Sequence, residues 1–514
     1  MGLLRAAATV GSYTLVSRVL GFARDILMAA TIGAGPVADA FFVALRLPNL
    51  FRSLFAEGAF SAAFVPLFAG ANAESGERAA RLFAEEALSV LLSALLGFVF
   101  LGEIFMPAVM RVIAPGFASA KFALAVELGR ITFPYLLFIA LVALAAGVLN
   151  SLDRFAAAAA TPILLNVFLI AALFAMHRFH VADGRFLAWA VTAAGVAQFL
   201  WLYSCVAQAG MALRLPRPRL SPEVRHTLKR MAPAIVGAGV TQLNLVISTA
   251  LASLLPTGAI SYLYYADRLN QLPLGVVGVA VGTAILPAMS RQIRLGDNEG
   301  ALSTQNRGLE LALLLTLPAA LALALLSRPI VAALFERGAF GPHAAAATAA
   351  ALSAYAGGLP AFVLIRILAP GFFARGDTKT PVRVAIAAML VNLTLTLVLM
   401  QFLAHVGVAL ATSVAGWVNA LALFALLRRH GHLHLDRRTQ KSLPRIAVST
   451  LGMALVLALL KEVLASALEG REVARLAALA GLVGAGLVTF AALAFLLGVA
   501  DPRNALRRLF REPA

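Results

Sequence analysis

Residues 17–61 read SRVLGFARDILMAATIGAGPVADAFFVALRLPNLFRSLFAEGAFS. This stretch is apolar enough to enter a bilayer, yet it carries a set of charged side chains: Arg18, Arg24, Asp25, Asp39, Arg46, Arg52 and Glu57. Ionisable groups at membrane depth are costly, and they normally face a partner or a water-filled cavity with a functional role. Because the arginines outnumber the carboxylates, we interpret the stretch as the wall of a hydrated cavity that receives an anion.

The composition of the whole chain is typical of a membrane protein. Of the 514 residues, 61% are hydrophobic and only 13% are charged, whereas soluble domains are about 25% charged. We therefore predict an all-α polytopic protein of the bacterial cytoplasmic (inner) membrane. The formal net charge of +18 does not indicate nucleic-acid binding, because most basic residues flank apolar spans and form no stripe on a soluble face. The single cysteine, Cys205, excludes a disulfide framework.

The apolar runs predict fourteen transmembrane helices, each long enough to cross a bilayer. The second run is unusually long and is interrupted around Pro48 and Gly58, so we expect a bent or partly unwound helix there. The predicted spans cover residues 8–32, 37–72, 84–112, 122–150, 156–177, 186–209, 231–255, 259–290, 304–335, 343–373, 382–403, 406–428, 445–467 and 473–499.

Lysines and arginines between the spans are concentrated on alternate linkers. Cytoplasmic linkers normally hold this excess. The bias therefore predicts an even number of spans with both termini in the cytoplasm. The first apolar segment is too long for a cleaved signal peptide and contains arginines, so we predict that it is retained as a helix.

A weak internal repeat relates the two halves of the chain. Six spans in each copy would give both copies the same orientation, so we predict two parallel six-helix lobes with the substrate path between them. The matches keep their order along the chain: Pro66 with Pro287, Pro134 with Pro360, Asn166 with Asn392, Gly195 with Gly416, and Gln198 with Asn419.

The repeat and the span count together predict the domain organisation. Two further helices follow the second lobe, and a basic segment ends the chain. The predicted parts are an N-terminal lobe (1–210), a cytoplasmic linker between the lobes (211–230), a C-terminal lobe (231–430), the final helix pair (431–500) and a basic cytoplasmic tail (501–514).

The charged residues of the first span lie on two adjoining faces of the predicted helix. Ser17 and Arg24 share one face, and Arg18 and Asp25 share the next. The eighth span contributes Asp267 and Arg268 from the run YLYYADRLNQLP, so each lobe presents an arginine early. We expect the two lobes to grip one anion from both sides.

Arginine in these positions favours a diphosphate cargo over a monovalent ion. A guanidinium stays charged when it is partly desolvated, and its planar fork of donors fits two phosphate oxygens. An alternative stays open: the arginines are paired locally, Arg24 with Asp39 or Arg52 with Glu57, and only hold helices together.

Two other charged pairs have the spacing of neighbours on one helix, and we interpret them as structural. They are Glu127 with Arg130 and Arg307 with Glu310.

The sequence contains no constellation typical of an enzyme. The histidines lie in predicted loops or at span ends, so no histidine relay and no intramembrane metal site are visible. No GxxxxGK[ST] motif is present, so the chain has no ATPase of its own. We predict a transporter without a cofactor, driven by an ion gradient, the membrane potential or the flux of its substrate.

Four runs of sequence carry a resemblance to a known family. They are SRVLGFARD (17–25), ADAFFVALRLPNLFRSLFAEGAFSAAFVP (38–66), YYADRL (264–269) and LAPGFFARGDTKTP (368–381). Together they resemble the MurJ (MviN) family of lipid II flippases, which belongs to the multidrug, oligosaccharidyl-lipid and polysaccharide (MOP) exporter superfamily, together with the MATE transporters. The resemblance covers the full length of the chain.

The resemblance implies a function and a set of site residues. Members of this family move lipid II, the undecaprenyl-diphosphate-linked disaccharide pentapeptide, to the outer leaflet for peptidoglycan synthesis, and they are thought to alternate between inward-open and outward-open states. The last two helices resemble a pair that forms a groove for the lipid tail. The positions that match the family's motifs are Arg18, Arg24, Arg52 and Arg268, with Asp25, Asp39, Asn49 and Glu57 beside them.

The resemblance also bears on ion coupling and on partners. Some members of the family bind sodium in the second lobe, where Asn392 and Thr412 are candidate ligands here. The seventh span offers Asn244 but no carboxylate, which departs from that pattern. Besides lipid II, we expect membrane lipids and the cell-wall synthesis machinery as partners.

Two alternatives from other functional classes remain at this point. A drug or ion antiporter of the same superfamily would need a protonatable carboxylate as its dominant cavity group. A scaffold of cell-wall assembly that transports nothing would tolerate the loss of cavity arginines.

Overall fold

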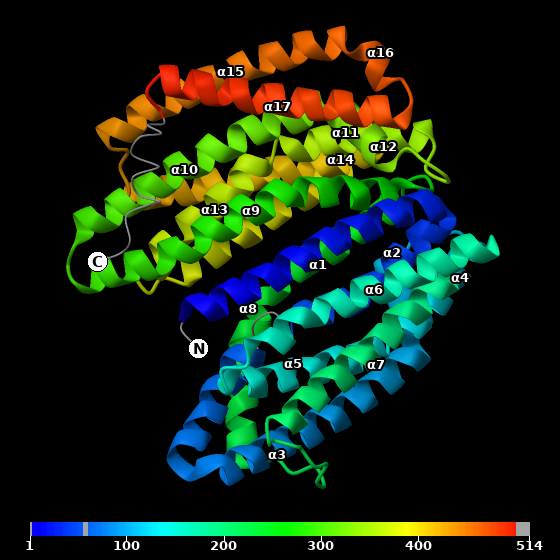
Figure 1. The fold of residues 1–514 in the computed structure, drawn as a ribbon. Helices are drawn as coiled ribbons and strands as arrows, with labels where there is room; N and C mark the ends of the chain where they lie inside the picture. Colours follow the sequence, from blue (N-terminus) through cyan, green and yellow to red (C-terminus); the bar gives the residue numbers. More distant parts are fainter. Residues whose placement is uncertain (1–2, 55–59, 500–514) are drawn as a thin grey trace. The chain divides into compact units, whose positions relative to one another are not determined.

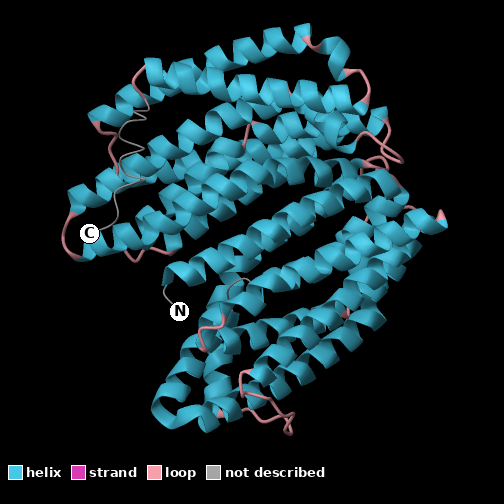
Figure 2. Ribbon diagram, viewed as in Figure 1, coloured by secondary structure: helices cyan, strands magenta, loops and turns pink. Residues whose placement is uncertain are grey.

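The computed structural model describes residues 3–54 and 60–499. Within them every regular element is an α-helix, as predicted, and Figure 2 shows the helices joined by turns and short loops. Three predictions, for Glu57, for a break of the second span at Gly58 and for the tail at 501–514, lie outside the described residues. The helices are α1 (Leu3–Ile32), α2 (Pro36–Leu54), α3 (Phe60–Ile113), α4 (Ser119–Thr132), α5 (Tyr135–Ser151), α6 (Phe155–Phe179), α7 (Gly184–Gln208), α8 (Pro222–Ser253), α9 (Ala259–Arg294), α10 (Asn298–Leu325), α11 (Ser327–Phe335), α12 (Pro342–Ala356), α13 (Leu359–Phe373), α14 (Lys379–Arg429), α15 (Arg437–Val463), α16 (Ala465–Leu468) and α17 (Glu472–Leu496).

The chain forms two compact units. The first comprises Met1–Ser261 with Arg337–Phe340, and the second comprises Tyr262–Glu336 with Gly341–Ala514. Within the first unit α1 packs along α6, and α5 packs against α7 (Figure 1). Within the second unit α13 packs against α14, and α15 lies beside α17. The domain boundaries predicted from the sequence stay predictions.

Nine helical segments in the described part of the chain are long and apolar enough to cross a membrane. The total of fourteen spans therefore stays a prediction. One expectation was wrong: Pro48 does not interrupt the second span, because α2 continues through it to Leu54. The nine segments are Ala63–Ile113, Ser119–Ser151, Phe155–Phe179, Gly184–Gln208, Asn298–Leu325, Pro342–Phe373, Lys379–Arg429, Arg437–Val463 and Glu472–Leu496.

A reversal of the backbone divides α14 between the predicted spans 382–403 and 406–428. Ala404 adopts φ 46° and ψ −128° there, a conformation that costs energy for a residue with a Cβ. The two arms then approach closely at Gly407, where an added Cβ would lie 2.5 Å from the carbonyl carbon of Leu399. A glycine is therefore required at Gly407 for the arms to pack.

Residues that the internal repeat aligns make a similar helix contact in each unit, a glycine packed closely on an aromatic ring. In the first unit Gly195 of α7 faces Tyr135 of α5, and a Cβ on this glycine would lie 2.7 Å from the ring. In the second unit Gly416 of α14 faces Phe362 of α13, again at 2.7 Å. Both aromatic residues closely follow prolines that the repeat superimposes, Pro134 and Pro360. The two halves therefore use the same close approach of a glycine to an aromatic ring.

A polar network attaches the start of α15 to α10. Arg307 pairs with Glu310, as predicted, and also with Asp436, the N-cap of α15. Ser442 donates a hydrogen bond of 2.6 Å to the same Glu310 carboxylate. Burial raises the pKa of Asp436, but hydrogen bonds from Thr439 and the Arg307 guanidinium outweigh this effect and hold the pKa below its ordinary value.

Candidate functional site

The central polar cluster of the first unit joins α1 to α6. The Arg24 guanidinium donates from Nε and Nη2 to one oxygen of Asp25, at 3.0 and 2.7 Å, and from Nη1 to Asn166 Oδ1 at 3.0 Å. The Asn166 amide nitrogen in turn donates to the backbone carbonyl of Ser17 at 2.9 Å, with the Ser17 hydroxyl at 3.4 Å. The predicted shared face of Ser17 and Arg24 is thus confirmed, since both residues contact one asparagine.

Most of this cluster is removed from solvent. The side chains of Arg24 and Asp25 are 13% and 4% exposed, and Asn166 is 5% exposed. Gly21 lies between the two polar turns of α1, and a Cβ there would contact the Asn166 amide at 3.6 Å. Arg18, by contrast, is exposed. Because Asp25 offsets the charge of Arg24, Arg18 is the arginine of this part of α1 whose charge is not offset by a neighbouring carboxylate in the sequence.

Asp39 forms a second cluster, at the start of α2. Its side chain is 1% exposed and forms an ion pair with Lys121 of α4 at 3.2 Å. The carboxylate also accepts hydrogen bonds from the backbone nitrogens of Gly258 and Ser261, at 2.8 and 3.0 Å, and from the Ser261 hydroxyl at 2.7 Å. The alternative in which Asp39 pairs with Arg24 is therefore wrong, because both oxygens of Asp39 are occupied elsewhere.

The remaining predicted residues of α2 lie near its end. Asn49 and Arg52 are partly buried, and Arg52 stands in the last turn of α2. A cation is favoured there by the helix dipole. The next residue, Ser53, accepts a hydrogen bond of 2.8 Å from Gln242 of α8, so the end of α2 is fixed to a neighbouring helix.

Two predicted site residues, Asp267 and Arg268 of α9, belong to the second compact unit. The Arg268 guanidinium lies over the Tyr264 ring, 4.7 Å from its centroid, in a cation–π contact. Asp267 accepts a hydrogen bond from Gln271 one turn later in the helix. That Arg24 and Arg268 grip one anion stays a prediction.

One structural pair expected from the sequence is wrong. Glu127 does not pair with Arg130 but with Arg185 of α7, at 2.6 and 2.9 Å to the two carboxylate oxygens. Arg130 instead donates to the backbone carbonyl of Glu103 at 3.2 Å. Glu127 therefore links α4 to α7 and does not stabilise a single helix.

The candidates for a sodium site are spread over the chain. Asn244 lies in α8 of the first unit, and Asn392 and Thr412 lie on the two arms of α14 in the second unit. The Thr412 hydroxyl donates to the Val408 carbonyl at 2.9 Å. In the described part of the chain, no group of three or more His, Cys, Asp or Glu side chains could hold a metal ion. Sodium binding stays a prediction.

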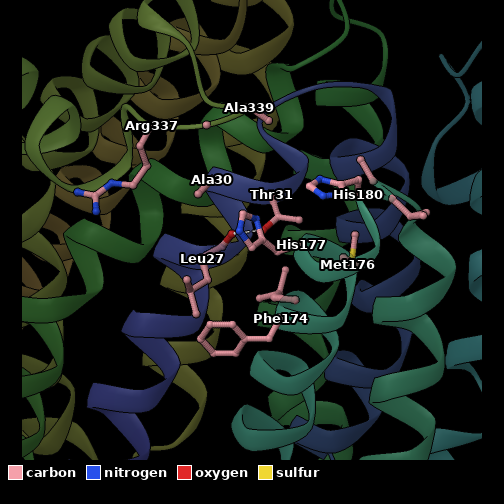
Figure 3. Close-up of a pocket in the computed structure, with 13 residues that line it drawn as sticks. Leu27, Ala30, Thr31, Phe174, Met176, His177, His180, Arg337 and Ala339 are labelled. Atoms are coloured by element: carbon pink, nitrogen blue, oxygen red, sulfur yellow. Dashed lines mark hydrogen bonds between the residues drawn. The ribbon is translucent and has the colours of Figure 1, made fainter.

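A mostly apolar pocket of about 560 Å³ lies at the C-terminal end of α1, where Leu27, Ala30 and Thr31 line it (Figure 3). Residues at the ends of α1 and α6, including His177, line it with His180 just after α6 and with Arg337, Gly338 and Ala339 of the short segment Arg337–Phe340. This segment is fixed to α1 by a hydrogen bond of 2.8 Å from the Ala339 nitrogen to the Ala30 carbonyl. None of the predicted cargo residues lines this pocket.

Two residues that organise these clusters, Asn166 and Lys121, were not expected as site residues from the sequence. Asn166 stands out as an amide inside an apolar span, but the sequence analysis used it only as a repeat match. Lys121 lies in the first turn of α4, just before the predicted span 122–150, where a lysine is common at the membrane surface. Its Nζ lies 4.2 Å from the Phe117 ring centroid and 3.2 Å from the Thr257 hydroxyl.

Comparisons with known proteins give one consistent result. A family model described as "Lipid II flippase MurJ" matches residues 28–476. A probable lipid II flippase MurJ from Rhizobium meliloti is 47% identical over 98% of this chain and 95% of its own, and the lipid II flippase MurJ of Burkholderia cenocepacia is 39% identical over 96% of each chain.

Solved structures agree with these sequence matches. A structure titled "Lipid II flippase MurJ, inward closed conformation" has a TM-score of 0.79 and 27% identity, over 98% of this chain and 99% of its own. An inward-facing MATE family transporter of the MOP superfamily has a TM-score of 0.70 at 13% identity, over 82% of this chain and 98% of its own, which indicates a shared fold alone.

Proposed function

The chain belongs to the MurJ family of lipid II flippases, and from that membership we propose that the polar cluster on α1 binds the diphosphate of its cargo. The protein is a lipid II flippase, a transporter and not an enzyme, and a multi-pass protein of the inner membrane. Its cargo is the undecaprenyl-diphosphate-linked precursor of peptidoglycan.

The observation that carries the site proposal is the way Arg24 is held. Two partners on different helices, Asp25 and Asn166, fix its guanidinium in an otherwise apolar region. Guanidinium groups with a fixed plane recognise phosphate oxygens in two-point contacts. Arg18 and Arg52 supply further positive charge, so the diphosphate meets a cationic region while the polyprenyl tail stays in lipid.

Transport follows if access to this region alternates between the two sides of the membrane. The head group enters from the cytoplasm, is held by the arginines, and is released when the cavity opens to the periplasm. Arg268 of the second compact unit is the second contact in this scheme. We place both termini in the cytoplasm, on the distribution of basic residues between the spans.

The energy source and further partners belong to the proposal as well. The chain carries no nucleotide-binding motif, so an ion gradient, the membrane potential or the flux of lipid II supplies the driving force. Asn244, Asn392 and Thr412 remain the candidates for a sodium ion. Membrane lipids and the enzymes of cell-wall synthesis are the expected partners.

The experiment that tests the site replaces Arg24 by alanine in a strain that depends on this protein. Loss of growth at normal abundance in the membrane supports the cargo role, whereas reduced abundance would mean that Arg24 mainly holds α1 to α6 through Asp25 and Asn166. A scaffold would retain its function in this variant. An antiporter of the same superfamily would lose drug or ion transport and leave lipid II unaffected.

A further inference from the structure

Asn166 connects the two residues of α1 that the sequence places on one face. It lies in α6 and is 5% exposed. Its Oδ1 accepts from Arg24 Nη1 at 3.0 Å, and its Nδ2 donates to the Ser17 carbonyl at 2.9 Å. The oxygen and the nitrogen of the Asn166 amide therefore each form a hydrogen bond, and the two partners, Arg24 and Ser17, lie on different turns of α1.

We propose that Asn166 is a positioning residue for lipid II binding, which acts by fixing the Arg24 guanidinium in the orientation that meets the diphosphate. The inference rests on the proposed function of Arg24. Asn166 itself contacts no cargo in this proposal.

The geometry supports an orienting role over simple packing. Asp25 engages the Nε and Nη2 edge of the guanidinium, while Asn166 engages Nη1 from another helix. If Asp25 were its only partner, the Arg24 side chain could still change rotamer and turn the plane of its guanidinium. An arginine side chain carries about 2 kcal/mol of rotamer entropy. A second contact from α6 fixes the plane, so less entropy is lost when a phosphate binds.

The chemistry of the amide also explains why the partner is neutral. A second carboxylate on the guanidinium would compete with the phosphate for the same positive charge. An asparagine accepts one hydrogen bond and leaves the net charge of the Arg24–Asp25 pair unchanged. Its donor end bonds to the backbone of α1 at Ser17, which sets the side-chain rotamer of Asn166 itself.

A double-mutant cycle on the full-length protein in nanodiscs tests the proposal, with lipid II as the probe. The variants are Asn166→Ala, Arg24→Ala and their combination, and lipid II affinity and thermal stability are measured for each. Asn166→Leu serves as a second variant that keeps the volume of the side chain. Asn306→Ala is the matched control, since Asn306 is fully buried in the second unit and donates to the His434 carbonyl at 3.0 Å.

We expect Asn166→Ala to weaken lipid II binding about tenfold, and Arg24→Ala about a hundredfold, because misplacement of a binding group is costly. The combination should bind no worse than Arg24→Ala alone, because Asn166 acts through Arg24. Asn306→Ala should lower the melting temperature and leave lipid II affinity within about twofold of the wild type, as expected for a residue that does not interact with the site.

Two results would overturn the proposal, and they differ from failure of the site itself. If Asn166→Ala lowered lipid II affinity by the same factor in the wild type and in Arg24→Ala, Asn166 would only pack helices. Wild-type affinity in both Asn166 variants would likewise exclude a positioning role. If Arg24→Ala itself bound lipid II normally, the proposed diphosphate site would fail, whatever the Asn166 variants did.

Discussion

Replacing Asp39 by alanine should destabilise the protein strongly. The carboxylate is 1% exposed and makes four polar contacts, to Lys121 Nζ, the Gly258 nitrogen, and the nitrogen and hydroxyl of Ser261. Alanine would leave the ammonium group of Lys121, which is 10% exposed, and the backbone at the start of α9 without their acceptor.

The size of the effect follows from these contacts. A hydrogen bond to a charged group contributes about 1.5–3 kcal/mol, but four bonds to one carboxylate are not additive. Lys121 also keeps the Thr257 hydroxyl at 3.2 Å as a partner. Loss of one member of a buried ion pair typically costs about 3–5 kcal/mol, so we expect a loss of that order in the free energy of unfolding.

Equilibrium unfolding of the purified protein in detergent micelles measures this loss. Lys121→Met tests the ion pair separately, and the Asp39→Ala, Lys121→Met double variant should show a coupling of about 0.5–3 kcal/mol. A change in unfolding free energy within about 0.5 kcal/mol for Asp39→Ala, the usual range for surface positions, would refute the reasoning. Normal stability combined with weak lipid II binding would instead make Asp39 a cargo contact, as the family resemblance implies.

Three further predictions concern packing and the polar network of α15. Gly195→Ala should cost about 1–3 kcal/mol by overpacking, since its Cβ would lie 2.7 Å from the Tyr135 ring, whereas Gly97→Ala, with open space around it, should cost nothing in the same melting assay. Arg307→Ala should speed amide exchange at the start of α15, because its pairs with Glu310 and Asp436 are lost; unchanged exchange would contradict this attachment. Because the pKa of Asp436 is held below its ordinary value of 3.8, its contribution to stability is present above that value and is lost as the pH falls through the folded-state pKa. The protection of the α15 amides, relative to the intrinsic exchange rate at each pH, should therefore fall in acid for the wild type and change less for Asp436→Asn.

The helical architecture could be predicted from the sequence because it follows from apolar runs and their spacing. Several predicted boundaries fall at observed breaks, such as the reversal at Ala404. Pro48 does not end α2, which continues through it to Leu54, although a proline inside a helix removes a backbone hydrogen bond and its ring crowds the preceding turn. The total of fourteen spans stays a prediction, because nine helical segments in the described part of the chain are long and apolar enough to cross a membrane.

The partners of the buried charges could not be predicted, because tertiary contacts decide them. Arg24 finds Asn166, which lies 142 positions away in the sequence. Glu127 prefers Arg185 over its helical neighbour Arg130, since the guanidinium from α7 reaches both carboxylate oxygens. Residue spacing predicts only which side chains are neighbours on the same helix. Asn166 and Arg185 come from other helices, so their contacts could not be predicted in this way.

The central claim is that this protein moves lipid II by means of its arginines, and the sidedness of lipid II in cells tests it most directly. Cells depleted of the protein would be rescued by the wild type or by variants of Arg18, Arg24, Arg52 or Arg268, and an external enzyme would cleave only outer-leaflet lipid II. We predict that depletion protects lipid II from cleavage, that the wild type restores cleavage, and that Arg24→Ala at normal abundance does not. Cleavage that continues throughout depletion would contradict the account.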